Sequence, residues 1–151
     1  MYFFVEKKKN KKWISCDVWK EDEYYIGCFF VPEEHLACGK PKKELIELLT
    51  GYKSKKQPIK QPVGLPRDMS LPVKLIETYE VRRGSMFARN HTFYYLHELI
   101  DFFEKKKHSP SFKAYINKYF YFFKRKTLPL LKKIKKEKGV EDVRVVIWID
   151  L

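Results

Sequence analysis

The chain has 151 residues, with 32 lysines and arginines against 19 aspartates and glutamates, and a formal net charge of +13 at pH 7. This length predicts one domain, residues 1–151, that buries enough surface to fold without metals or disulfides. The charge favours phosphate-bearing or otherwise acidic partners, and a hydrophobic fraction of 44% argues against global disorder.

The N-terminus and the cysteines indicate a soluble protein inside a cell. The first residues, "MYFFVEKKK", are too few for a signal sequence or a membrane span. Cys16, Cys28 and Cys38 form an odd set without a CxxC pair, which is typical of free thiols in a reducing compartment. We therefore expect a cytoplasmic protein without membrane contact.

Three β-rich runs open the chain, at residues 1–6, 12–20 and 24–31. The first two are joined by "KKKNKK", which predicts a hairpin turn although the favoured Asn-Gly pair is absent. Another strand is expected at residues 142–151, "DVRVVIWIDL". These runs predict an antiparallel meander to which the C-terminal strand returns.

Helical patterns fill the middle of the chain. The segment "KKELIELLTG", residues 42–51, places leucines on one side of a short helix that Gly51 ends. The prolines of residues 58–66 then hold a rigid loop. Ser70 caps a second helix, whose first turn accepts Pro72 because the missing N–H there would have had no partner.

Residues 80–92 lack a clean periodicity and predict a loop that could include a short strand. An amphipathic helix is expected from Tyr94 onward. Its apolar residues recur at helical spacing: Leu96, Leu99, Ile100 and Phe103. Ser109 and Pro110 open a long helix to about Lys138, with a kink at Pro129. These elements predict an α+β fold in which a small antiparallel sheet packs with three to four helices.

The run Tyr119–Phe123 places five consecutive aromatic residues in a predicted helix, so they cover all of its faces. Such a helix is either buried between the sheet and another helix or exposed as a self-association surface, since a large exposed apolar patch usually marks an interface. We expect a homo-oligomer formed through this segment.

The sequence carries no motif for catalysis or metal binding. It lacks a Gly-rich phosphate loop, an HExxH or GxSxG sequence, and zinc-ligand spacing among its cysteines and histidines. Asp68 beside Arg67 fits a turn or capping carboxylate better than a catalytic group. We therefore predict no catalytic residue, no metal and no cofactor, and a protein that is not an enzyme.

One irregular stretch combines residues that suit phosphates and bases. Arginine matches phosphate with a planar fork, a threonine hydroxyl adds a neutral donor, and aromatic rings stack on bases. In the alternative interpretation the arginines are solvated and the aromatics belong to the core. The predicted ligand-binding residues are Arg67, Arg82, Arg83, Arg89, His91, Thr92, Phe93 and Tyr94.

Several segments together resemble a family of small, mostly uncharacterised proteins encoded by bacteriophages and prophages. They are "ELIELLTGYK", "GLPRDMS", "NHTFYYLHEL" and "VRVVIWID", spread over residues 41–150, with a weaker similarity in "VEKKKNKKW". Where the family often reads His-Ser-His-Ser, this chain keeps His91 and Thr92 and has Arg89 at the first histidine. The resemblance implies an accessory phage protein that acts in the host cytoplasm.

Several phage proteins of this kind sequester cyclic oligonucleotides or NAD-derived immune signals in basic, aromatic pockets. The resemblance therefore favours a counter-defence protein that binds a small phosphorylated nucleotide without catalysis. The alternatives are a DNA- or RNA-binding protein that uses the lysine runs, and a protein-binding inhibitor of a host defence enzyme. A continuous basic face with steep salt dependence would indicate nucleic acid, whereas a closed pocket would indicate a nucleotide.

Overall fold

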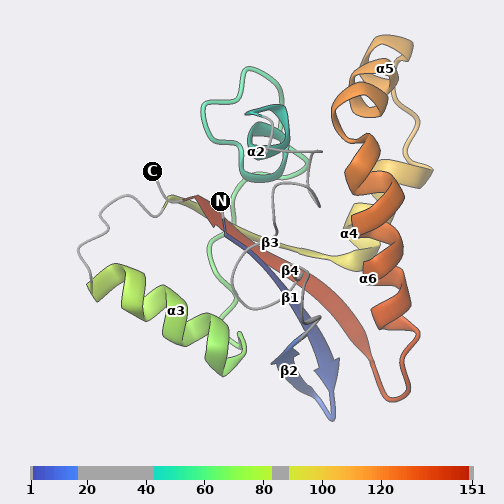
Figure 1. Cartoon of the computed structure of the whole chain (residues 1–151). Coiled ribbons are helices and arrows are strands. Elements are labelled where there is room, and N and C mark those ends of the chain that lie inside the picture. The colour runs from blue at the N-terminus through green and yellow to red at the C-terminus, as the bar shows by residue number, and fades with distance from the viewer. Residues whose placement is uncertain (1, 17–42, 83–88, 150–151) are drawn as a thin grey trace, which may run out of the picture.

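The computed structural model describes residues 2–16, 43–82 and 89–149 (Figure 1). Four strands of these residues form one antiparallel sheet in the order β2-β1-β4-β3. They are β1 (Tyr2–Lys9), β2 (Lys12–Ser15), β3 (Arg89–Tyr95) and β4 (Asp142–Ile149). The return of the C-terminal strand to the N-terminal strands is confirmed, because β4 pairs with β1 at the centre of the sheet. The predicted third strand, residues 24–31, lies outside the described residues.

The helices lie on both sides of this sheet (Figure 1). Those of the described residues are α2 (Lys43–Thr50), α3 (Leu71–Arg82), α4 (Leu96–Ile100), α5 (Pro110–Tyr119) and α6 (Leu128–Lys135). Two π-helical turns, η1 (Asp101–Lys105) and η2 (Phe123–Thr127), follow α4 and precede α6. The α+β class is confirmed, with more helices than the three to four predicted.

The hairpin between β1 and β2 turns at Asn10 and Lys11. Their φ angles are 48° and 61°, and two central residues with positive φ are the mark of the type I′ turn, whose twist matches that of the strands. Asparagine tolerates this conformation better than most residues. The predicted hairpin is therefore present without the Asn-Gly pair.

Both faces of the sheet are buried, each against different elements. One face packs on α2 and on the helices from α4 to α6, and this larger core contains Val5, Leu49, Tyr94, Leu99, Phe103, Phe120, Phe123, Leu131, Val145 and Ile147. The opposite face packs on α3 and on the loop before it, and this smaller core contains Phe4, Val73, Val146 and Trp148, with Leu65, Met69 and Phe93 against it. The strand β4 is buried on both faces for this reason.

One predicted boundary after the loop at residues 80–92 is corrected by the structure. The short strand that this stretch allowed is present as the start of β3, at residues 89–92, but Tyr94 belongs to the same strand rather than to the following helix. The helix α4 begins at Leu96, where the Glu98 carboxylate accepts the N–H of Tyr95 at 2.8 Å. A capping carboxylate three residues into the helix thus sets its start later than the apolar spacing suggested.

The long helix predicted between Pro110 and Lys138 is interrupted, but not where the proline predicted. It breaks at Phe120, where φ is −117° and ψ is 14°. A π-helical turn then precedes α6, and Pro129 lies in the first turn of α6, where a proline costs little. The break lets Phe120 and Phe123 both point into the larger core.

Candidate functional site

The predicted binding residues of β3 are divided between the two faces of the sheet, because successive side chains of a strand point to opposite sides. Thr92 and Tyr94 are fully buried on the side of the larger core. The Tyr94 hydroxyl donates to the carbonyl oxygen of Leu49 at 2.6 Å, and burial raises its pKa. Both side chains are buried in the described structure, and the ligand-binding role of these two residues stays a prediction.

His91 and Phe93 lie on the opposite face, near Trp148. The centroid of the His91 ring is 5.8 Å from that of Trp148, and its Nε2 atom has no hydrogen-bond partner among the described residues. Burial lowers the pKa of His91, although the nearby Glu77 carboxylate raises it. The neutral imidazole is therefore favoured, and it brings no positive charge to a phosphate.

The predicted arginines are only partly placed by the structure. Arg67 is exposed in the turn before α3. Arg82 ends α3 and Arg89 begins β3, but their side chains lie outside what the structure describes, as does all of Arg83. A phosphate site built from these arginines therefore stays a prediction.

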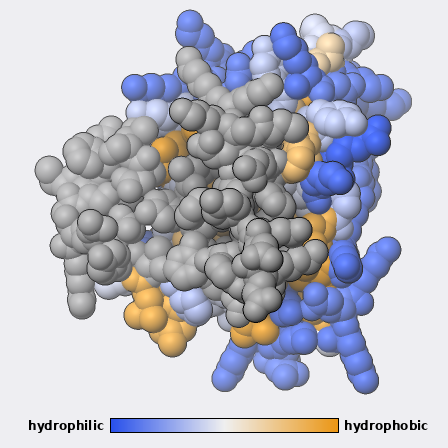
Figure 2. Space-filling view, in the orientation of Figure 1, coloured by the Kyte–Doolittle hydropathy of each residue, from blue (hydrophilic) through white to orange (hydrophobic). Residues whose placement is uncertain are grey.

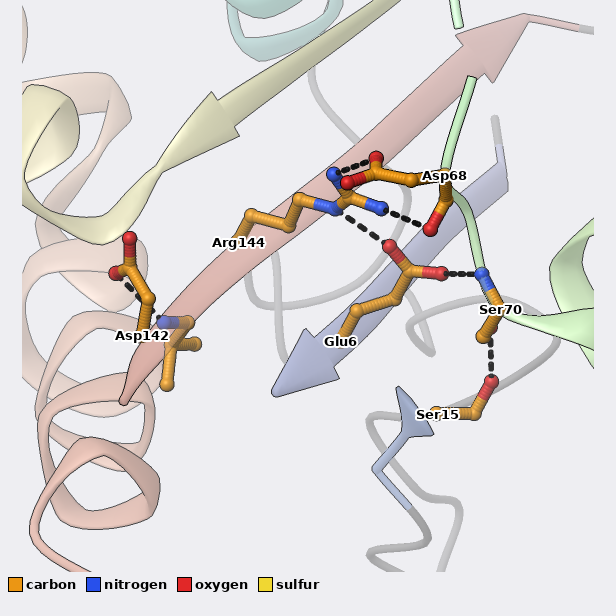
Figure 3. Close-up of polar contacts among 7 residues, drawn as sticks. Glu6, Ser15, Asp68, Ser70, Asp142 and Arg144 are labelled. Carbon is orange, nitrogen blue, oxygen red and sulfur yellow. Dashed lines mark hydrogen bonds and ion pairs between the residues drawn. The ribbon is translucent and has the colours of Figure 1, made fainter. Parts of the chain in front are cut away.

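Another arginine, Arg144 of β4, is enclosed by acidic groups from two distant segments (Figure 3). Its Nε donates to Glu6 Oε2 at 2.6 Å, its Nη1 donates to Asp68 Oδ1 at 2.8 Å, and its Nη2 donates to the main-chain oxygen of Asp68 at 3.1 Å. The ring centroid of Trp13 lies 3.9 Å from its Cζ. Asp68 lies in a turn, as predicted, but its carboxylate pairs with Arg144. Burial raises the pKa of Asp68, yet the hydrogen bond and charge of Arg144 hold it below its ordinary value.

The segment "GLPRDMS" is fastened to the sheet at both of its ends. The Glu6 carboxylate accepts the N–H of Ser70 at 2.5 Å, and the Ser70 hydroxyl lies 2.7 Å from that of Ser15 (Figure 3). At the other end, the N–H of Gly64 donates to the carbonyl oxygen of His91 at 2.9 Å. The segment therefore holds the start of α3 against β1 and β3.

Four of the five segments behind the predicted resemblance meet on this face of the sheet, whereas "ELIELLTGYK" lies in and just after α2, which packs on the other face. "VEKKKNKKW" supplies Glu6 and Trp13, "GLPRDMS" supplies Asp68, and "VRVVIWID" supplies Arg144. "NHTFYYLHEL" supplies Phe93, whose ring centroid lies 5.9 Å from the guanidinium carbon. A structural network thus accounts for these residues, and in it one guanidinium pairs with two carboxylates.

A cleft that the sequence analysis did not single out lies between the loop before Lys60 and the start of α5. Its volume is about 450 Å³. We call it the lysine cleft, and its lining residues are Lys56, Gln57, Pro58, Ile59, Phe102, Lys106, Lys107, His108, Ser109 and Phe112. None of these residues carries a carboxylate, so the lining is positively charged.

Several contacts fix the shape of the lysine cleft. The His108 Nε2 atom is 2.8 Å from the carbonyl oxygen of Phe102, and Ser109 caps α5 by accepting an N–H of its first turn. Lys56 lies over the Tyr115 ring, with its Nζ 3.7 Å from the centroid. The pKa of Tyr115 is raised to about 12 by burial and by neighbouring acidic residues of α2. The aromatic walls are therefore held in place without a ligand.

A second cleft of about 450 Å³ adjoins the first and has a different electrostatic character. The two share Ile59, Phe102 and Lys106. The second also contains Glu98, which accepts from the Lys60 Nζ at 2.9 Å, and Asp101, which pairs with Lys105 at 3.3 Å. Two of its three lysines are thus paired with carboxylates, so the lysine cleft is the better of the two for an anion.

The lysine cleft could not be recognised from either of the sequence segments that form it. Both "YKSKKQPIK" and "EKKKHSP" are short lysine runs, and such runs are most often solvated turns. The sequence feature that points to this cleft is the helix start at Ser109 and Pro110, which follows three lysines and one histidine. A helix N-terminus and nearby lysines together favour anions. Only the fold shows that a second lysine run faces this start.

Among the described residues, no three side chains of His, Cys, Asp or Glu come together to hold a metal ion. Within the same residues, no helix combines the length and the apolar character that crossing a membrane requires. Comparison with protein-family models, with curated proteins and with solved structures found no match to this chain.

Proposed function

We propose that this chain binds a small phosphorylated nucleotide in the lysine cleft and sequesters it without catalysis. The observation that carries the proposal is the lining of the cleft, which combines three lysines and two phenylalanines with no carboxylate. A volume of about 450 Å³ falls within the range of small-molecule sites, roughly 300–1,000 Å³. The proposed site differs from the arginine and histidine stretch that the sequence indicated.

The phosphate would lie at the end of the cleft formed by Lys106, Lys107 and the start of α5. Both lysines are exposed, and none of the described carboxylates pairs with them. The dipole of α5 favours a negative charge at its start. The lysines would bind the phosphate, because Pro110 has no N–H and the N–H of Phe112 already donates to the Ser109 hydroxyl. Lys56 adds a third positive charge from the opposite wall.

The base would lie against Phe102 and Phe112, whose rings line the cleft and pack against each other at 6.2 Å. Aromatic faces stack on any base, so the phosphates rather than the base would determine which ligand the cleft selects. The His108 imidazole is held by the Phe102 carbonyl oxygen at 2.8 Å.

The biological role that we propose follows from the resemblance to bacteriophage and prophage proteins. A protein that removes a nucleotide signal from the host cytoplasm needs affinity and abundance but no chemistry. Cyclic oligonucleotides and NAD-derived signals both carry phosphates and purine bases, and the cleft offers groups for both. The proposed role is therefore counter-defence by sequestration.

The test is isothermal titration of the purified chain with cyclic dinucleotides, cyclic trinucleotides and ADP-ribose derivatives, followed by recovery of the ligand after denaturation. We expect one of these ligands to bind and to be recovered intact. Lys106→Glu with Lys107→Glu should weaken its binding at least tenfold. The control, Lys11→Glu with Lys12→Glu, makes the same charge change in the exposed β1–β2 hairpin and should leave binding unchanged.

Absence of binding across the panel would contradict the proposal, as would equal weakening by the two double variants. A chemically changed ligand would show that the protein is an enzyme. Both lysine pairs are exposed, so loss of folding does not explain a difference between them.

A further inference from the structure

The net positive charge of the chain is concentrated in one segment. Residues 105–138 contain thirteen lysines and arginines and one acidic residue, Glu137, a surplus of twelve positive charges against +13 for the whole chain. The segment begins at the end of η1 and includes α5, η2 and α6. Figure 2 shows hydrophilic side chains over the top and right of the molecule, where Figure 1 places these helices.

The helices of this segment have one buried side and one basic side. The side toward the sheet is made of Ile116, Phe120, Phe123, Leu128, Leu131 and Ile134. The outward side carries exposed residues three to eight positions apart, which we call the basic stripe: Lys118, Tyr121, Arg125, Lys133 and Lys136. Lys118 lies before the break at Phe120. The part from Arg125 to Lys136 follows η2 and α6, and at 1.5 Å per residue it is about 17 Å long, which roughly equals five phosphate spacings of a nucleic-acid strand.

The charges of the basic stripe are not neutralised by the protein. Within the part of the chain that the structure describes, no carboxylate pairs with its lysines or its arginine. Two acidic residues of this region pair with other lysines, since Glu104 binds Lys132 and Glu137 binds Lys7 at 2.8 Å. The stripe therefore presents an uncompensated row of cations to solvent.

An aromatic ring interrupts this row of cations. The Tyr121 side chain is 57% exposed, and the guanidinium carbon of Arg125 lies 5.2 Å from its centroid. The ring thus stands among charges that would hold a phosphate backbone on either side. Stacking of a base on such a ring tolerates any sequence and requires the base to be unpaired.

We infer that the basic stripe binds single-stranded nucleic acid, with phosphates on its cations and one base stacked on Tyr121. A second copy of the chain fits this surface poorly, because two faces with the same positive charge repel. A duplex keeps its bases stacked internally and would leave Tyr121 without a partner. The inference is independent of the nucleotide site, since the two surfaces share no residue.

The test is fluorescence anisotropy with labelled 12-residue oligo(dT) and oligo(U) between 50 and 200 mM NaCl. Four phosphate contacts predict a slope of about −2.8 in log affinity against log salt, so binding should weaken about 50-fold over this range. Arg125→Ala with Lys133→Ala should halve the slope. Tyr121→Ala should weaken binding at least fivefold and leave the slope unchanged.

The control, Lys11→Ala with Lys12→Ala, removes two exposed cations from the β1–β2 hairpin and should change neither affinity nor slope. The inference is overturned if no oligonucleotide binds at 50 mM NaCl, or if the stripe variant and the control behave alike. Duplex DNA or poly-glutamate that binds as tightly as oligo(dT) would also overturn it. Circular dichroism and thermal unfolding show whether each variant is folded.

Discussion

Replacing Arg144 with methionine should destabilise the protein strongly, because it leaves a buried carboxylate without its cation. The side chains of Arg144 and Glu6 both have 0% relative exposure, and their Nε and Oε2 atoms are 2.6 Å apart. Removing one partner of such a buried pair costs about 3–5 kcal/mol. For a chain of this size that corresponds to a fall in Tm of roughly 6–20 °C. The Asp68 side chain is 67% exposed and stays solvated in the variant, so it adds little.

The assay is urea unfolding followed by far-UV circular dichroism, since Trp13 contacts the guanidinium and its fluorescence would change for local reasons. Glu6→Leu combined with Arg144→Met removes both charges and should recover most of the lost stability. It does not recover all of it, because the N–H of Ser70 loses its acceptor. A cost below about 1 kcal/mol for Arg144→Met, or a double variant less stable than the single one, would refute the reasoning.

Three further predictions concern pH and packing. Burial raises the pKa of Asp68, but its arginine partner holds this pKa below 3.8. The ion pair therefore stabilises the fold above pH 3.8, and this stabilisation is lost as pH falls through the lowered pKa. Asp68→Asn should therefore lose less stability than the wild type in acid unfolding. Burial lowers the pKa of His91 below 6.5, so protonation of this imidazole destabilises the fold as pH falls below 6.5. An NMR titration should find the midpoint of His91 below 6.5, and a midpoint above that value would contradict its burial. In urea unfolding, Phe120→Ala should lower the free energy of unfolding by about 3–5 kcal/mol, because its ring is buried. Tyr121→Ala should lower it by less than about 0.5 kcal/mol, because its ring is exposed. Equal losses would contradict this difference in burial.

The strands at the two ends of the chain could be predicted because their patterns are local, whereas β3 could not be recognised with the same clarity. Asn90 has a φ of 54°, and the pairing with β4 shifts in register between Arg89 and Thr92. Both faces of the strand are covered, so polar and apolar residues do not alternate. The helix break at Phe120 could not be predicted for a related reason. Five consecutive aromatic residues, Tyr119–Phe123, place apolar side chains on every face of a helix, so the sequence there has no hydrophobic periodicity.

The candidate sites depend on contacts that no local pattern contains. Asp68 looks like a turn residue in the sequence, and its arginine partner is 76 positions away. The lysine cleft joins residues 56–59 with residues 102–112. Among the five aromatic residues expected to form an oligomer interface, Phe120 and Phe123 are buried, while Tyr121 is exposed. Self-association through this segment stays a prediction.

The pairing of β1 with β4 sets the order in which this protein can be completed during synthesis. Phe4 lies opposite Val146 in the register of the two central strands, so the middle of the sheet cannot form until β4 has left the ribosome. The apolar sides of α5 and α6 are made earlier and have no sheet to cover them during that interval. Contacts this distant in sequence form slowly and expose aggregation-prone surface. A translational pause before residue 142 would therefore lower the yield of folded protein more than one placed earlier in the chain.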